Sequence, residues 1–250
     1  MSKKILKNFK TSLFKLLEKE KISILSKIIK YIRNPSKIFP RLIISGLKKI
    51  SVEMNWDKRV QQMGNSAVFA NNISKKEQEK ITKIHQEILS KVLKNKLKKK
   101  TKVLDFGCGY GRFSDFFIKN FNSNYVGVEN SKLFLKNSKN SKKKNFLSFA
   151  DFKKNKKYNN YFDLCFIFAV LGGLKKEKAK RIVKILKNKT KPNGKICFVD
   201  IVSEKEKEGS WNFRTENFYE ILFYEFKTLN KYYFLEDGQK KMIYYGEKIK

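Results

Sequence analysis

The sequence predicts an α/β fold, in which a mostly parallel seven-stranded sheet ends in a C-terminal antiparallel hairpin and follows an N-terminal helical extension. Short apolar runs alternate with amphipathic segments between residues 102 and 202, which is typical of parallel strands joined by crossover helices. Two aromatic-rich runs follow, separated by Asp237-Gly238, a dipeptide that favours a two-residue hairpin turn. Residues 1–50 carry apolar side chains at helical spacing.

The elements can be placed in order along the chain. A capping box, Ser74 to Glu77, begins a helix that precedes the sheet. The five strands expected to be parallel are Val103–Phe106, Tyr125–Val128, Phe146–Phe149, Phe162–Phe168 and Lys195–Val202. The expected helices between and after them begin at Arg112 and Ser131, span Glu177–Lys189 and lie near Glu216–Phe226. The hairpin strands are Thr228–Leu235 and Lys240–Tyr245.

Charge and motifs divide the chain into three parts. Lys and Arg outnumber Asp and Glu by 58 to 23, so the formal net charge is +35. Residues 1–50, a basic amphipathic helical extension, hold 14 basic and 2 acidic residues, whereas residues 201–250 hold 9 of each. Residues 51–100 are assigned to a helical lead-in, and residues 101–250 to the domain that carries the chemistry. The extension could pack on that domain, self-associate or lie on an anionic membrane.

The basic charge does not by itself indicate a nucleic-acid partner. Only six of the 58 basic residues are Arg, although Arg is the better ligand for phosphates and base edges. Lys, Asn, Ile and Phe share AT-rich codons, so nucleotide composition can account for much of the excess. Cys108, Cys165 and Cys197 have no metal-ligand spacing, and no apolar run is long enough to cross a bilayer. We expect a cytoplasmic protein without a metal, with peripheral membrane contact as an open alternative.

The most informative segment is V-L-D-F-G-C-G-Y-G-R, residues 103–112. A predicted strand enters three glycines spaced by two and then a helix, which leaves room for a ligand beside the positive end of the helix. The dinucleotide fingerprint G-x-G-x-x-G would require glycine at position 112, which is Arg. Gly107, Gly109 and Gly111 therefore do not fit a nicotinamide cofactor, and a tight turn without a ligand is the simpler alternative.

This register, with Asp105 before the glycines, resembles the first motif of class I S-adenosylmethionine-dependent methyltransferases, which have a Rossmann-like fold. Tyr125–Glu129 is a second strand that ends in an acid, Asp151 follows the third strand, and Lys191–Lys195 resembles the family's turn before the fifth strand. The resemblance covers about residues 100–246 and implies S-adenosylmethionine as cofactor. The cofactor-binding residues that we predict are Asp105, Gly107, Cys108, Gly109, Gly111, Glu129, Asn130, Asp151, Phe152, Phe168 and Arg59.

The resemblance also implies roles for several of these residues. The glycine loop and Asp105 would hold the methionine part of the cofactor, while Glu129 would accept the ribose hydroxyl protons. Asp151 would contact the adenine amino group, and Phe152 would pack on the adenine face. The segment W-D-K-R, which ends at Arg59, resembles a lid segment of some small-molecule methyltransferases, so Arg59 is expected to meet the cofactor carboxylate. Alternatively, Glu129, Asp151 and Arg59 are solvated and bind no ligand.

The sequence departs from the family after the fourth strand. Many small-molecule members have histidines there that face the methyl group, but both positions are glycine here, Gly172 and Gly173. His85, the only histidine, borders the apolar face of a helix and is expected to pack rather than react. Asp200, at the end of the fifth strand, is therefore the candidate general base. The segment after that strand resembles an insertion that lines acceptor pockets, and its candidate substrate-binding residues are Trp211, Asn212 and Arg214.

Three functions remain open at this point. The leading hypothesis is methyl transfer by in-line displacement to an O or N atom of a small or carrier-linked acceptor, such as a sugar, a lipid-linked compound or another secondary metabolite. The second is an RNA methyltransferase that uses the basic helices of residues 1–50, although a nucleic-acid partner is disfavoured. The third is a non-catalytic membrane-surface or assembly protein that retains the fold.

Overall fold

The computed structural model describes residues 54–70, 73–138, 140, 142–209 and 211–249. Residues 51–250 form one compact unit. The predicted helical extension, residues 1–50, lies outside the described residues.

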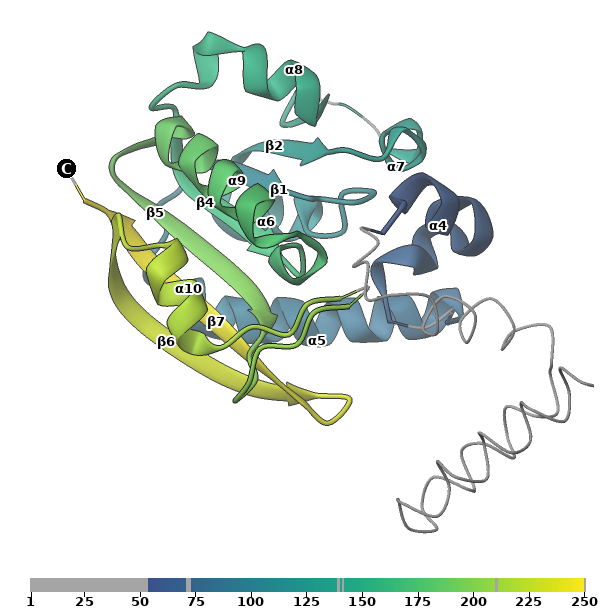
Figure 1. The fold of residues 1–250 in the computed structure, drawn as a ribbon. Coiled ribbons are helices and arrows are strands. Elements are labelled where there is room, and N and C mark those ends of the chain that lie inside the picture. Colours follow the sequence, from purple (N-terminus) through teal and green to yellow (C-terminus); the bar gives the residue numbers. More distant parts are fainter. Residues whose placement is uncertain (1–53, 71–72, 139, 141, 210, 250) are drawn as a thin grey trace, which may run out of the picture. The chain divides into compact units, whose positions relative to one another are not determined.

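A seven-stranded sheet with the order β3-β2-β1-β4-β5-β7-β6 forms the centre of this unit (Figure 1). Its strands are β1 (Lys102–Phe106), β2 (Asn124–Glu129), β3 (Lys144–Ser148), β4 (Phe162–Phe168), β5 (Thr190–Ile201), β6 (Phe226–Glu236) and β7 (Gln239–Lys248). Strands β1 to β5 are parallel to one another, and β7 runs antiparallel to both β5 and β6. The predicted fold class is therefore confirmed. Asp237 and Gly238 form the hairpin turn with φ of 49° and 71°, as the Asp-Gly signal requires.

Helices cover both faces of the sheet. The α-helices are α4 (Trp56–Met63), α5 (Lys75–Leu93), α6 (Ser114–Phe121), α7 (Lys132–Asn137), α8 (Phe149–Lys154), α9 (Lys176–Lys189) and α10 (Glu216–Leu222), and the short 3-10 helices are η2 (Gly64–Val68), η3 (Lys156–Tyr158) and η4 (Leu171–Gly173). The capping box is present, because Ser74 and Glu77 exchange side-chain and backbone hydrogen bonds at the start of α5.

Alternate residues of the central strands enter two separate apolar cores. In β1, Val103 packs with residues of α5 and α6, whereas Leu104 packs with residues of α8, α9 and α10. This is the two-residue period of a strand that is buried on both faces. Because β1 to β5 run in the same direction, their carboxyl ends meet at one edge of the sheet, beside α4 and α7 (Figure 1).

The third strand differs from the prediction in a way that affects the site. β3 ends at Ser148, and Phe149 already belongs to α8. The Ser148 side chain caps this helix by accepting a hydrogen bond from the Asp151 backbone N–H. The chain therefore turns one residue earlier than its apolar pattern suggested, which changes the direction of the side chains that follow.

Candidate functional site

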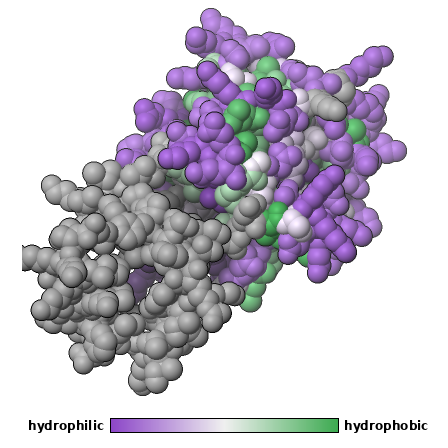
Figure 2. Space-filling view, turned by 90° about the vertical axis from the view of Figure 1, so that its right-hand side faces the viewer, coloured by the Kyte–Doolittle hydropathy of each residue, from purple (hydrophilic) through white to green (hydrophobic). Residues whose placement is uncertain are grey.

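A cavity of about 440 Å³ lies at the carboxyl ends of β1, β2 and β4. Its volume falls within the range of roughly 300–1,000 Å³ typical of small-molecule sites. The walls come from the glycine loop, the strand ends, residues 54–57 and the first half of α9. Figure 2 looks onto the side of the molecule where α4 and α7 lie, and there hydrophobic residues are exposed between hydrophilic ones.

The glycine loop folds back against the end of β2. The backbone N–H groups of Gly107 and Cys108 donate to the carbonyl of Val128 at 2.7 and 3.2 Å. Gly107 has φ of 76°, and a Cβ placed on it would lie 2.4 Å from a methyl carbon of Val170. Glycine is therefore required at position 107 both by conformation and by space, and the loop presents bare backbone to the cavity.

Glu129 connects the glycine loop to the start of α7. Its carboxylate accepts hydrogen bonds from the backbone N–H groups of Gly109, Asn130 and Ser131, at 2.9, 2.7 and 2.9 Å. Burial raises the pKa of Glu129, and these three hydrogen bonds oppose the rise. A carboxylate offers about four lone-pair sites, so one further donor, such as a hydroxyl, can still be accommodated.

Asp105 lies on the cavity wall at the end of β1 but is only 1 % exposed. Its carboxylate accepts a 2.6 Å hydrogen bond from the hydroxyl of Tyr125 on β2. Burial raises the pKa of Asp105 to about 7, and the Tyr125 hydrogen bond and the charge of Arg112 act in the opposite direction. This carboxyl group therefore titrates near neutral pH, where a cationic ligand would favour its ionised form.

Arg112 is a site residue that the sequence analysis used only to exclude a dinucleotide. Its guanidinium carbon lies 5.1, 4.5 and 4.8 Å from the ring centroids of Phe69, Phe113 and Phe168. Burial lowers the pKa of Arg112 to about 10, so the group remains charged at neutral pH. Among the described residues, none forms a hydrogen bond or an ion pair with this guanidinium. The charge of Asp105 acts on Arg112 but makes no direct contact with it, so the free hydrogen-bond donors on the cavity wall suit an anionic ligand group.

The segment before α5 closes one side of the cavity. Asp57 accepts hydrogen bonds from Ser131 Oγ at 2.6 Å and from the Leu133 backbone N–H at 3.3 Å, which connects α4 to α7. Burial of Val68 against the glycine loop completes the contact, since a Cβ on Gly109 would lie 2.9 Å from Val68 Cγ1. Residues 54–57 and Val68 therefore cover the loop.

A sequence profile of the family described as "Methyltransferase domain" matches residues 97–240, more than half of the chain. The chain belongs to this methyltransferase family. No match was found among curated protein sequences. The methyltransferase is an enzyme whose cofactor is S-adenosylmethionine, as the first motif implied.

Solved structures share the fold at low sequence identity. A SAM-dependent methyltransferase from Leishmania major superposes with a TM-score of 0.63 at 18 % identity, over 76 % of this chain and 80 % of that one. The 1,6-didemethyltoxoflavin-N1-methyltransferase of Burkholderia thailandensis gives 0.55 at 14 % identity, over 68 % and 78 %. A SAM-dependent methyltransferase from Methanosarcina mazei gives 0.54 at 16 % identity, over 63 % and 97 %. At these identities the likeness establishes the fold alone.

The cavity of this methyltransferase fits the cofactor. The bare backbone at Gly107 leaves space for a ligand, and Glu129 retains acceptor capacity for a hydroxyl group. The unpartnered guanidinium of Arg112 and the buried carboxyl of Asp105 provide opposite charges on one wall, which suits the carboxylate and ammonium of an amino acid. Cys108, Asn130 and Phe168 also lie on the cavity wall.

Two predictions for the adenine side, Phe152 and Asp151, need correction. Phe152 is completely buried, with its ring 5.7 Å from that of Tyr158 and 6.2 Å from that of Phe162, so it cannot pack on an adenine. Asp151 is exposed, hydrogen bonds to Ser148 and lies outside the cavity wall. Phe149 is the aromatic residue of this segment that faces the cavity, because α8 begins there.

Arg59 does not face the cavity either. Its Nε donates to the carbonyl of Ala67 at 2.9 Å, and one terminal nitrogen donates to the carbonyls of Phe69 and Ala70 at 2.6 and 3.2 Å. The guanidinium thereby holds the turn around η2 that places Val68 over the glycine loop. The prediction that Arg59 would meet the cofactor carboxylate is therefore wrong, and the arginine on the cavity wall is Arg112.

The predicted substrate-binding segment packs on the loop after β4. The indole of Trp211 lies on Gly172, where a Cβ would come within 2.3 Å of Nε1. Asn212 Nδ2 donates to the carbonyls of Gly172 and Leu174, both at 3.0 Å. Arg214 is 1 % exposed and pairs with Glu206 at 3.2 Å. Trp211, Asn212 and Arg214 therefore all lie outside the described cavity wall.

Asp200, the candidate base, is 1 % exposed and also lies outside the described cavity wall. Its carboxylate accepts the backbone N–H groups of Gly172 at 3.1 Å and Ile201 at 2.9 Å. Burial raises its pKa to about 6, and these backbone hydrogen bonds oppose the rise. The buried Asp200 therefore anchors the loop after β4 through its hydrogen bond with Gly172.

The described residues also bear on metal binding, disulfide bonds and membrane insertion. No group of three or more His, Cys, Asp or Glu residues among them could hold a metal ion. Each of the three cysteines is buried and unpaired. No helix in the described part of the chain is long and apolar enough to span a membrane.

Proposed function

We propose that this enzyme methylates a small or carrier-linked acceptor, and that its nucleophile is one that needs no base from the protein. The bound cofactor supplies a methyl group on a sulfonium centre, so the chain mainly has to align the reactants. The observation that carries the proposal is the partly open cavity of about 440 Å³, which residues 54–57 and Val68 line on one side. A cavity of this size suits a small acceptor or a flexible carrier arm.

Charge complementarity supports an orientation for the cofactor. Arg112, which has no partner among the described residues, would bind the carboxylate of the methionine part, and Asp105 would bind its ammonium group. Glu129, whose carboxylate has one remaining acceptor site, would receive a ribose hydroxyl. Phe149 would then lie nearest to the adenine, in place of Phe152.

The acceptor's chemistry follows from the groups that the cavity offers. Among the described lining residues the carboxylates are Asp57, Asp105 and Glu129, and the first and last are already held by hydrogen bonds from Ser131 and the loop backbone. The lone histidine, His85, lies outside the described wall. An amine can lose its proton to water before attack, whereas a poorly acidic hydroxyl requires a positioned base. The arrangement therefore favours an amine nitrogen over a sugar hydroxyl.

A labelling experiment tests both parts of the proposal. The enzyme would be incubated with S-adenosylmethionine labelled on the methyl group and with a cell extract separated by mass. Arg112→Met, whose cofactor binding should be weaker, would serve as the control with reduced labelling. We expect label in the low-mass fraction, on a compound whose labelled product is stable to hydrolysis as an N-methyl group. Label in the RNA or protein fraction would overturn the small-acceptor proposal, and an O-methyl product would overturn the amine.

A further inference from the structure

Two lysine-lined grooves lie at the amino ends of the parallel strands, at the opposite edge of the sheet from the cofactor cavity. One groove, of about 470 Å³, is lined by six lysines, Lys96, Lys98, Lys99, Lys100, Lys191 and Lys195. The other, of about 320 Å³, is lined by four, Lys142, Lys143, Lys144 and Lys157. Asp163 is the only acidic residue among the described residues that line the two grooves.

The two grooves adjoin. Thr101 lines the first and Asn124 the second, and the Asn124 N–H donates to the Thr101 carbonyl at 3.2 Å. Together they follow the starts of β3, β2, β1, β4 and β5, which are neighbours in the sheet. Four strand spacings of about 4.8 Å give a length of about 19 Å. We call these ten lysines the lysine stripe. Its length matches a chain of anions better than a single one.

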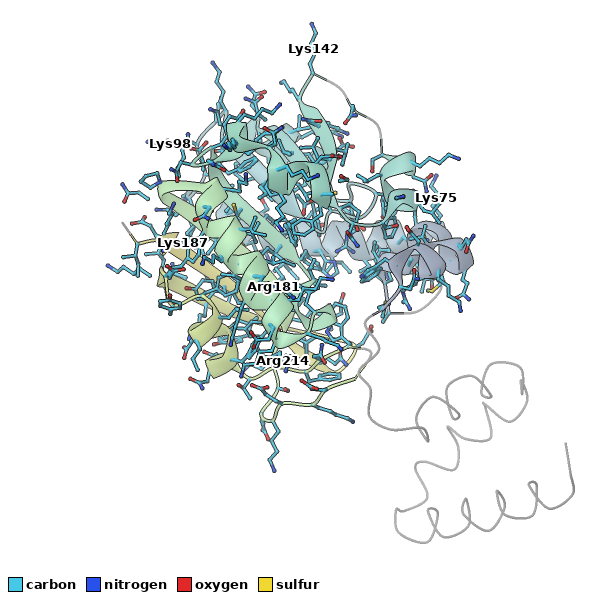
Figure 3. All side chains as sticks on the ribbon, turned by 45° about the horizontal axis from the view of Figure 1, so that its top comes forward. Lys75, Lys98, Lys142, Arg181, Lys187 and Arg214 are labelled. Atoms are coloured by element: carbon cyan, nitrogen blue, oxygen red, sulfur yellow. The ribbon has the colours of Figure 1, made fainter. Side chains whose placement is uncertain are left out.

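Much of this charge is not neutralised within the protein. Lys144, Lys191 and Lys195 pair with acids. The remaining exposed lysines of the stripe form no ion pair with any described residue, and they are Lys98, Lys99, Lys100, Lys142, Lys143 and Lys157. Figure 3 shows Lys98 and Lys142 pointing outward from the molecule, with Lys75 on the side away from Lys98. Some lysines elsewhere are matched by nearby acids, as Lys231 is by Glu216 and Glu220, whereas Asp163 is the single acid among the described residues that line the stripe.

The surface chemistry favours a polymer over a membrane. None of the exposed large hydrophobic residues in the described chain belongs to the stripe, so nothing there would insert between lipids. The stripe is also hollowed into grooves, whereas a bilayer surface needs a flat or convex face. A flexible strand with evenly spaced charges can follow such a groove.

We propose that the lysine stripe binds the phosphodiester backbone of single-stranded nucleic acid. Lysines contact phosphates as point charges and read base edges poorly compared with Arg, so binding is independent of sequence and strongly dependent on salt. The stripe lies at the amino end of β1 and Asp105 near its carboxyl end. The bound nucleic acid therefore lies away from the cofactor cavity. The stripe therefore holds the enzyme on a polyanion and does not present that strand for methylation.

The test measures fluorescence anisotropy of a labelled, unstructured 20-nucleotide RNA with the full chain, over a range of salt concentrations. Each neutralised phosphate contributes about −0.7 to the slope of log K against log salt. The stripe variant K98Q/K99Q/K100Q should therefore have a slope smaller by about 2 and bind about tenfold more weakly at low salt. The matched variant K76Q/K80Q/K83Q loses the same charge from exposed positions on α5, and its binding should change less than twofold.

Equal losses in the two variants would overturn the proposal, since they would show a general effect of net charge. Loss of binding to anionic vesicles, with RNA binding unchanged, would assign the stripe to membranes instead. Calorimetry with S-adenosylhomocysteine should give wild-type affinity for the stripe variant, which shows that it is folded. That readout is also independent of the acceptor, so failure of the stripe proposal and failure of the proposed methyl transfer remain distinguishable.

Discussion

The hydroxyl of Tyr125 donates a 2.6 Å hydrogen bond to the carboxylate of Asp105, and both side chains are buried at 1 % exposure. The two residues come from adjacent strands, and Tyr125 lies outside the described cavity wall. This contact lowers the pKa of Asp105, against the larger effect of burial, which raises it to about 7. Tyr125 thus influences the protonation of Asp105, the residue that we propose to bind the cofactor ammonium group.

Replacing Tyr125 by Phe should shift the pH dependence of cofactor binding. Without the hydrogen bond the pKa of Asp105 rises further, so the carboxyl is neutral over more of the neutral range and binds an ammonium group less well. We expect the affinity for S-adenosylhomocysteine at pH 7 to fall about tenfold and to recover toward pH 9, by calorimetry. Tyr158→Phe, which removes a buried hydroxyl bonded to Asn145, should leave the profile unchanged. An unshifted profile in Tyr125→Phe would refute this role.

Asp105→Asn should change how stability depends on pH. The raised pKa means that the folded wild-type protein binds this proton more tightly than the unfolded chain, so its free energy of unfolding falls as pH rises from about 4 to about 7. The variant has no such group, and its stability relative to wild type should grow by roughly 1.4 kcal/mol per pH unit in that window. Urea denaturation at pH 4.5, 6 and 7.5 measures this, with Asp115→Asn as an exposed control. A constant difference would contradict the assigned titration.

Arg112 should matter only for ligands that carry a carboxylate. Arg112→Met removes a charge-assisted contact worth about 1.5–3 kcal/mol, so the affinity for S-adenosylhomocysteine should fall about tenfold to a hundredfold. Methylthioadenosine lacks the amino-acid part, and its affinity should be unchanged. Because the guanidinium also contacts three phenylalanine rings and interacts with the charge of Asp105, we expect a modest loss of thermal stability. Arg181→Met, at an exposed position of α9 (Figure 3), is the control. Equal losses for both ligands would place the Arg112 contact elsewhere.

Local sequence signals were sufficient for the elements of this fold. The apolar runs, the Ser74 capping box and the Asp237-Gly238 turn each depend on neighbours in the chain, and each predicted the right element, although the bounds of β3 and β5 differ by a few residues. The strand ends Asp105 and Glu129 were also placed at the cavity, because parallel strands bring their carboxyl ends together. Both residues lie on strands, so the backbone fixes the direction of each side chain.

The mistaken assignments have a common physical origin. Phe152 and Arg59 follow turns whose exact start decides which way a side chain points, and one residue of difference in β3 moved the cavity contact to Phe149. The role that we propose for Arg112 depends on its lack of a hydrogen-bonded partner in three dimensions, which no spacing in the sequence reveals. Asp200 was placed correctly at a strand end, yet its carboxylate accepts a hydrogen bond from the backbone N–H of Gly172, in a loop that is distant in sequence.

The glycine pair that departs from the family pattern has a structural cause that can be tested. Gly172→Ala would place a methyl group 2.3 Å from Trp211 Nε1, so we expect a loss of about 1–3 kcal/mol in the free energy of unfolding. Gly209→Ala is the control: it lies in the segment of Trp211, and its new methyl group would meet no atom closer than 3.5 Å. Trp211→Ala removes the obstruction, so the double variant should be more stable than the sum of the two single losses predicts, by 0.5 kcal/mol or more. Additive losses would show that Trp211 does not determine the glycine, and the missing histidine would then need another explanation.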